Sequence, residues 1–188
     1  MWTRKGFTLI EVLTVVVIVG VLASFAVSEY KKVIERSRAS EAIQLLRSLY
    51  HAEKLYQMAY GTFANSLEEL DFSFKGIPVT CSQNNNSSCW GYYNAEAIQG
   101  NTWSVELEKG KNPSISVGRI SGPYMGTGFF MQLERADGIQ YPLETLACLE
   151  NSKGRFKYNK KAGSYCEDLL DGSFYSSSSV SRKYEIKL

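Results

Sequence analysis

The sequence has little of what an active site usually needs. Its 188 residues include one histidine, His51, and the four cysteines contain no Cys-x-x-Cys pair. A Ser-His-Asp or Cys-His arrangement would have to be built around that one position, and no zinc-ligand spacing is present. The adjacent carboxylates Glu68–Glu69 and Glu167–Asp168 are typical of a solvated surface. We therefore predict that the chain is not an enzyme and has no metal or cofactor.

The chain also lacks an excess of charge of either sign. It has 21 basic and 19 acidic residues, and two of the basic ones, Arg4 and Lys5, lie in the first six positions. Without those six positions the chain is formally neutral. Gly122, Gly126 and Gly128 lack the strand-turn-helix spacing and the lysine of a phosphate-binding loop, so we read them as turns. Nucleic acid remains a possible partner, but the charge does not indicate one.

Charge is scarcest between Phe7 and Val27, where Glu11 is the only ionisable residue. A helix of this length extends about 30 Å and can cross a bilayer core. An intramembrane carboxylate is costly, which suggests that Glu11 has a function and a partner. A secretory signal would have a shorter apolar core followed by its small cleavage-site residue, whereas here Gly6 precedes the core. A plain membrane anchor is the stronger rival, but it leaves Glu11 unexplained.

The segment Gly-Phe-Thr-Leu-Ile-Glu from Gly6 to Glu11, preceded by Arg4-Lys5, resembles the class III signal of type IV pilins and pseudopilins. The resemblance implies cleavage between Gly6 and Phe7 by a prepilin peptidase, followed by N-methylation of Phe7. It also implies that Glu11 pairs with the N-terminal amine of a neighbouring subunit during assembly. An ammonium and a carboxylate buried together in an apolar bundle would offset each other's desolvation cost.

The helical pattern continues without a breaker from Phe7 to Tyr60. Residues 7–28 are apolar all round and form the expected transmembrane or filament-core half. Residues 29–60 carry one apolar stripe and form an amphipathic half, predicted to pack in a head made by residues 61–188. Residues 1–6 are the expected leader. Gly20 matches a glycine common in pilin helices, but Ser28 stands where pilins commonly have proline, so helix melting is less forced here.

Beyond Gly61, a predicted helix C-cap, the pattern changes. Ser66–Glu69 has the form of a capping box and predicts a short second helix. We predict strands from β-branched and aromatic enrichment at 103–107, 115–120 and 129–133, with further strands at 90–93 and 184–188, and a surface loop at 173–181. The expected fold is therefore α+β: a type IV pilin-like lollipop with a long N-terminal helix packed on an antiparallel sheet.

The resemblance also implies that the leader is cut on the cytoplasmic side of the membrane. The cysteines all follow the apolar helix, so this orientation places them outside the cytoplasm, where disulfides form. Four cysteines allow three pairings. We favour Cys81 with Cys89 and Cys148 with Cys166, because each pair is local and brackets a polar segment. The second segment contains lysines interleaved with Phe156, which could serve a nucleic-acid or glycan surface or be a solvated loop over packed aromatics. Residues 85–88 fit a glycosylation pattern, but an unmodified loop is favoured.

The resemblance implies a structural subunit of a type IV pilus, or fimbrium, that polymerises through its helix into a helical homo-oligomer. It would sit in the inner membrane as a single-pass protein before assembly and in an extracellular pilus afterwards. Its implied partners are the prepilin peptidase, an assembly ATPase and a platform protein, and its implied roles are adhesion, twitching motility or DNA uptake. The alternatives are a type II secretion pseudopilin and a bitopic, membrane-anchored periplasmic binding protein.

Overall fold

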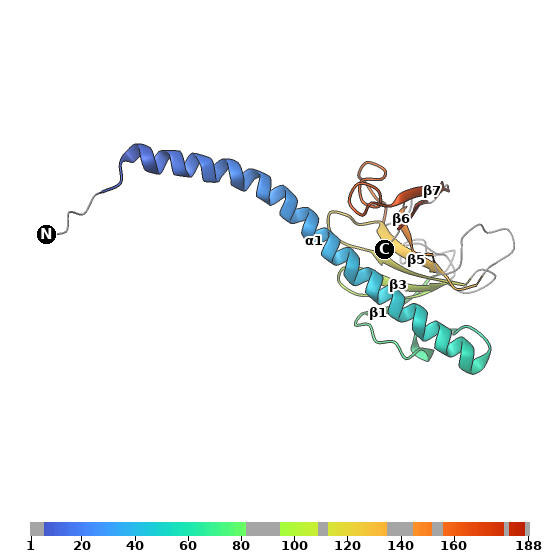
Figure 1. Ribbon diagram of the computed structural model, residues 1–188. Coiled ribbons are helices and arrows are strands. Elements are labelled where there is room, and N and C mark those ends of the chain that lie inside the picture. Colours follow the sequence, from blue (N-terminus) through green and yellow to red (C-terminus); the bar gives the residue numbers. More distant parts are fainter. Residues whose placement is uncertain are drawn as a thin grey trace. The chain divides into compact units, whose positions relative to one another are not determined.

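The computed structural model describes residues 6–81, 95–108, 113–134, 145–151, 156–178 and 181–186. The chain divides into two compact units, residues 1–38 and 39–188, and we describe each by itself. One helix, α1 (Leu9–Tyr60), supplies most of the first unit and the start of the second (Figure 1). It contains no proline. It ends where predicted, because Gly61 adopts a φ of +75° and donates its N–H to the Gln57 carbonyl at 2.8 Å.

The second unit is built on an eight-stranded antiparallel sheet. The strands are β1 (Ile77–Cys81), β2 (Ala95–Gln99), β3 (Trp103–Glu108), β4 (Ser114–Arg119), β5 (Thr127–Gln132), β6 (Ala147–Asn151), β7 (Ser173–Ser177) and β8 (Ser181–Glu185). Their order is β1-β2-β3-β4-β5-β6-β8-β7, so a simple meander runs to β6 and β8 then inserts between β6 and the edge strand β7.

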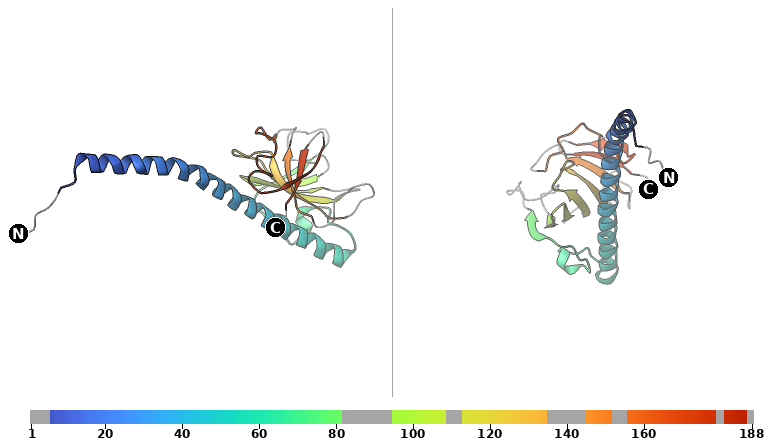
Figure 2. Two further views of the ribbon diagram at one scale, coloured as in Figure 1. Left: turned by 45° about the horizontal axis from the view of Figure 1, so that its top comes forward. Right: turned by 90° about the vertical axis from the view of Figure 1, so that its left-hand side faces the viewer.

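The later part of α1 covers one face of this sheet, as Figures 1 and 2 show. Ala42, Leu46 and Leu49 recur at helical spacing, and all three are fully buried. They belong to one core cluster with alternate residues of the strands, such as Val105 and Val117. This packing confirms the predicted α+β fold with an antiparallel sheet on the long helix.

The opposite face of the sheet has a smaller apolar cluster, formed by Phe130, Ala147, Leu149 and Phe156. Strands β4, β5 and β6 are therefore buried along their whole length and do not alternate between buried and exposed positions. Strand β6 was not predicted, because Ala147–Asn151 contains no β-branched or aromatic residue.

The carboxylates of Glu53, on α1, and Glu69, on the segment that follows it, form hydrogen bonds that connect this segment to the helix. Glu53 accepts a hydrogen bond from the Ala64 N–H at 3.2 Å, and Glu69 accepts from the Asn65 N–H at 2.8 Å and from the Tyr56 hydroxyl at 3.0 Å. The second oxygen of Glu53 is buried without a hydrogen-bond partner. Burial raises the pKa of Glu53, although the Ala64 amide opposes this shift.

Several details of the sequence prediction are wrong. The second helix is a single 3₁₀ turn, η1 (Leu67–Glu69). Ser66 makes no side-chain cap, since the Glu69 N–H donates to the Ser66 carbonyl at 3.2 Å and the Glu69 carboxylate is engaged with Asn65 and Tyr56. The expected loop at 173–181 contains strand β7 and the start of β8. Serine-rich sequence is compatible with a strand here because β7 lies at an exposed sheet edge.

Other predicted elements differ from the structure in their position. Gly128 lies within β5, whereas Gly122 and Gly126 do occupy a turn with positive φ. The final strand is 181–185, earlier than the predicted 184–188. Strands β1 and β2 were not predicted, and the predicted strand at 90–93 lies outside the described residues.

Candidate functional site

The first candidate site is the start of α1. Gly6 and Phe7 are exposed and precede the helix, so the Gly6–Phe7 bond lies in non-helical backbone. Thr8 and Glu11 then hydrogen-bond reciprocally. The Thr8 N–H and hydroxyl donate to one Glu11 carboxylate oxygen at 2.8 and 2.7 Å, and the Glu11 N–H donates to the Thr8 hydroxyl at 3.4 Å.

This arrangement is a capping box, in which Thr8 is the N-cap and Glu11 the third helical residue. The first amides of a helix have no partner within it, and a carboxylate near them also interacts favourably with the helix dipole. Thr-x-x-Glu is a recognisable signal, but our sequence analysis assigned Glu11 an intersubunit partner and overlooked this partner in its own chain. Thr8 is thus a residue of the site that the structure adds.

The helix that follows presents its apolar side chains outward. In the first unit, residues 6–33 are all exposed, including Leu9 at 82% and Leu22 at 62%. By length and composition α1 could cross a membrane, with a mean hydropathy of 2.6 in its most apolar window. The hydroxyls of Thr14 and Ser24 donate to carbonyls of their own helix, which makes them tolerable in an apolar surrounding.

Gly20 and Ser28, the positions considered for helix melting, both lie within continuous α-helix. A Cβ added at Gly20 would meet no other atom within 4 Å. In the described part of the chain, packing therefore does not require glycine at this position.

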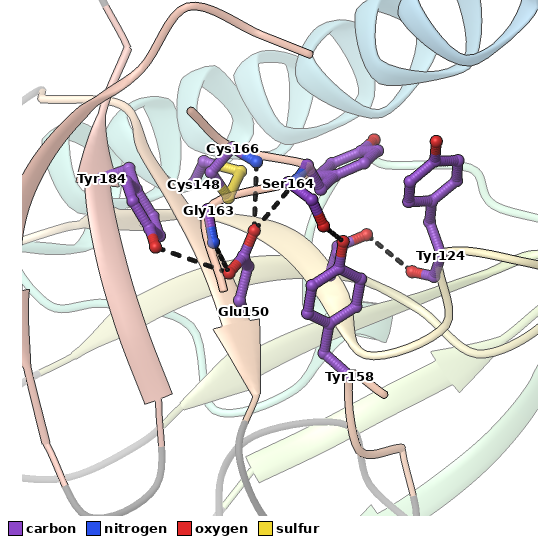
Figure 3. The surroundings of a disulfide bond; sticks show 10 residues. Tyr124, Cys148, Glu150, Tyr158, Gly163, Ser164, Cys166 and Tyr184 are labelled. Carbon is purple, nitrogen blue, oxygen red and sulfur yellow. Dashed lines mark hydrogen bonds between the residues drawn. A yellow bond between two sulfur atoms is a disulfide. The ribbon is translucent and has the colours of Figure 1, made fainter. Parts of the chain in front are cut away.

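The second candidate site is the segment closed by the disulfide between Cys148 and Cys166, whose Cα atoms are 5.7 Å apart. Glu150 lies two residues beyond Cys148 on β6 and is 2% exposed. Figure 3 shows its carboxylate pointing into the turn around Gly163. One oxygen accepts the N–H groups of Tyr165 and Cys166 at 3.1 and 3.2 Å, and the other accepts the Gly163 N–H at 2.7 Å.

A fourth donor, the Tyr184 hydroxyl, lies 3.5 Å from the second oxygen of Glu150. Burial, followed by the nearby Glu150 charge, raises the pKa of Tyr184 to about 12. Burial also raises the pKa of Tyr158 to about 12, although its hydroxyl bonds with Ser164 at 2.6 Å. The disulfide and one buried carboxylate together fix this turn on strand β6.

The aromatic residues of this segment face inward. Phe156, Tyr158 and Tyr165 are buried, whereas Lys157 and Lys161 are exposed. Stacking of nucleic-acid bases or sugars on these three rings is therefore ruled out by their burial, and the interpretation as a solvated basic loop over packed aromatics holds for the described part. Residues 153–155 lie outside that part.

Other predicted positions are less informative. Cys89 and the glycosylation pattern at 85–88 lie outside the described residues, as does the side chain of Cys81. His51 is exposed on α1. Among the described residues, no group of three or more histidine, cysteine or acidic side chains could hold a metal ion.

Comparison with known proteins identifies the N-terminal segment. Residues 3–27 match the family model of the prokaryotic N-terminal methylation motif. The chain is 42% identical over 67 residues to the type IV major pilin protein PilA of Myxococcus xanthus, covering 34% of this chain and 30% of that protein. It is 35% identical over 97 residues to a type IV major fimbrial protein FimA of Dichelobacter nodosus, covering 52% of this chain and 53% of the relative.

The chain thus spans about half or less of the length of these relatives, and no solved structure matches it. The relatives are structural pilins, which confirms the prediction that the chain is not an enzyme. The chain thus combines the N-terminal methylation motif with similarity to type IV major pilins and with the lollipop fold of a pilin, an antiparallel sheet packed on a long N-terminal helix.

Proposed function

We propose that this chain is a structural subunit of a type IV pilus, cut between Gly6 and Phe7 and polymerised through α1. The observation that carries the proposal is the exposed apolar surface of residues 7–27 combined with a single carboxylate, Glu11, at its start. Such a surface must be covered either by lipid or by other helices. A filament subunit would need both, first in the inner membrane and then in the fibre.

The geometry around Gly6 supports the processing step. The proposed scissile bond lies two residues before α1, in exposed backbone that a peptidase could bind in extended form. Cleavage would leave an amine on Phe7, directly before the Thr8 N–H that already donates to Glu11. The capping box thus keeps the Glu11 carboxylate at the end of the helix where N-terminal amines would gather.

In the proposed filament, Glu11 of one subunit pairs with the Phe7 amine of a neighbour. Buried charges gain little net stability from pairing, so we assign this contact to register more than to affinity. Assembly would require the prepilin peptidase, an ATPase and a platform protein. The head would lie on the outside of the fibre and carry roles such as adhesion, twitching motility or DNA uptake.

The first test is the N-terminal residue of this chain in sheared surface fibres, determined by mass spectrometry. N-methylated Phe7 in the fibre fraction is the expected result. Chains that begin at Met1 and occur only in the membrane fraction would contradict the proposal and favour an anchored periplasmic protein.

A second test separates assembly from helix capping. Glu11→Ala and Glu11→Gln should abolish fibres while the protein stays in the membrane, because both remove the charge that would pair with the amine. Thr8→Ala is the matched control, since it removes the cap hydroxyl and keeps the carboxylate, and it should leave fibres. Equal loss of fibres in all three variants would mean that Glu11 acts only as a helix cap.

A further inference from the structure

The residues just beyond the apolar run form a short band of charges on α1. In the first unit, four basic residues follow Val27, and Lys32 and Arg38 have carboxylate partners on the same helix. Lys32 lies 2.7 Å from Glu29, and Arg38 lies 2.8 Å from Glu35. Lys31 is exposed and forms no ion pair of 4 Å or less with any carboxylate in the described part of the chain.

The position of Lys31 along the helix matters as much as its charge. It follows Val27 by four residues, which places its Cα about 6 Å beyond the end of the apolar run. The polar headgroup layer on each side of a bilayer is roughly 5–8 Å thick. A span that ends at Val27 would therefore hold Lys31 at the depth of the lipid phosphates, whereas Arg38, seven residues later, would lie well outside them.

The neighbouring residue fits the same depth. Tyr30 is 66% exposed on α1. Tyrosine is enriched where a membrane-spanning helix meets the headgroups, because its ring is apolar and its hydroxyl is wet. The charges at this level, Glu29, Lys31 and Lys32, sum to one positive charge.

We propose that Lys31, beside Tyr30, binds the headgroup of an anionic phospholipid at the outer end of the membrane span. The inference rests on the proposed function, because it requires the subunit to be stored in a membrane. A basic residue near an anionic membrane surface gains about 1 kcal/mol, so Lys31 would favour an anionic over a zwitterionic lipid about fivefold. Leaving the membrane for the fibre would break this contact.

The test uses the full chain in liposomes of equimolar phosphatidylglycerol and phosphatidylethanolamine. Native mass spectrometry after release from these liposomes would give the ratio of the two lipids retained. Lys31→Glu should lower the phosphatidylglycerol preference by fivefold or more, and Lys31→Arg should keep it. Lys157→Glu, the same change at an exposed lysine of the second unit, is the matched control and should leave the ratio unchanged.

Arg4 and Lys5 contribute the same background in every variant, so the comparison isolates position 31. Before the lipid measurement, insertion is checked by resistance to alkaline carbonate. Release of the chain by carbonate would contradict the membrane-stored subunit and this inference together. Stable insertion with the same lipid ratio in wild type, Lys31→Glu and Lys157→Glu would overturn the lipid contact alone.

Discussion

Glu150 offers the sharpest test of how the head is held together. Its buried carboxylate receives three backbone N–H groups from the turn 163–166, in addition to the Tyr184 hydroxyl. In Glu150→Ala the donors lose their acceptor and remain inside the protein. At the lower figure of about 1 kcal/mol for each buried amide left unsatisfied, the three amides alone cost about 3 kcal/mol.

For a unit of about 150 residues, 1 kcal/mol shifts the melting temperature by about 2–4 °C. We therefore expect Glu150→Ala to lower the melting temperature by at least about 6–12 °C. Glu150→Gln should cost less, about 1–3 kcal/mol, because its amide oxygen can still accept from Tyr165 and Cys166 while its NH₂ group faces the Gly163 N–H.

The measurement is thermal melting of the full chain in mild detergent, followed by near-ultraviolet circular dichroism without reductant. Glu68→Gln is the matched control, since Glu68 is exposed and its change should stay within about 0.5 kcal/mol. Amide hydrogen exchange should also accelerate at Gly163, Tyr165 and Cys166 in Glu150→Ala. A melting temperature within 2 °C of wild type would refute the view that Glu150 holds this turn.

Four further changes test other parts of the structure. Thr8→Ala should destabilise the start of α1 by about 0.5–2 kcal/mol. The measurement is amide hydrogen exchange in detergent micelles, which should become faster at residues 9–11, and unchanged exchange would contradict the capping box. Gly126→Ala should lower the melting temperature sharply, because Gly126 has a φ of +89° and the new Cβ would lie 2.4 Å from the backbone nitrogen of Tyr158. A melting temperature less than 2 °C below that of wild type would count against this packing. Burial raises the pKa of Glu53, so ionisation of this carboxyl destabilises the fold as the pH rises through that pKa. The Glu53→Gln variant should therefore have a higher melting temperature than wild type at pH 7 and a smaller advantage at pH 4. A lower melting temperature than wild type at pH 7 would refute this. The pKa of Tyr158 is about 12 in the fold and about 10 in the unfolded chain, so the free energy of unfolding should fall between these pH values. This fall should be smaller in Tyr158→Phe, and identical melting curves of the two proteins at alkaline pH would contradict the prediction.

The sequence by itself determined the parts of this protein whose physics is local. An apolar run with one carboxylate and no proline predicts a helix that can cross a membrane, and the residues around Gly6 and Glu11 identify the N-terminal motif without any knowledge of the head. The end of α1 at Gly61 could also be predicted from the sequence, because a glycine with positive φ ends a helix through a local hydrogen bond. Here the Gly61 N–H donates to the carbonyl of Gln57, four residues earlier.

Only the tertiary structure decided which residues share a site when they lie far apart in the chain. Glu150 looks like an ordinary charged residue in the sequence, and it becomes a buried acceptor only because β6 carries it under a turn that begins 13 residues later. The serine-rich β7 is a strand because β8 pairs with it at the edge of the sheet. Such roles depend on long-range pairing, which local propensity and spacing do not contain.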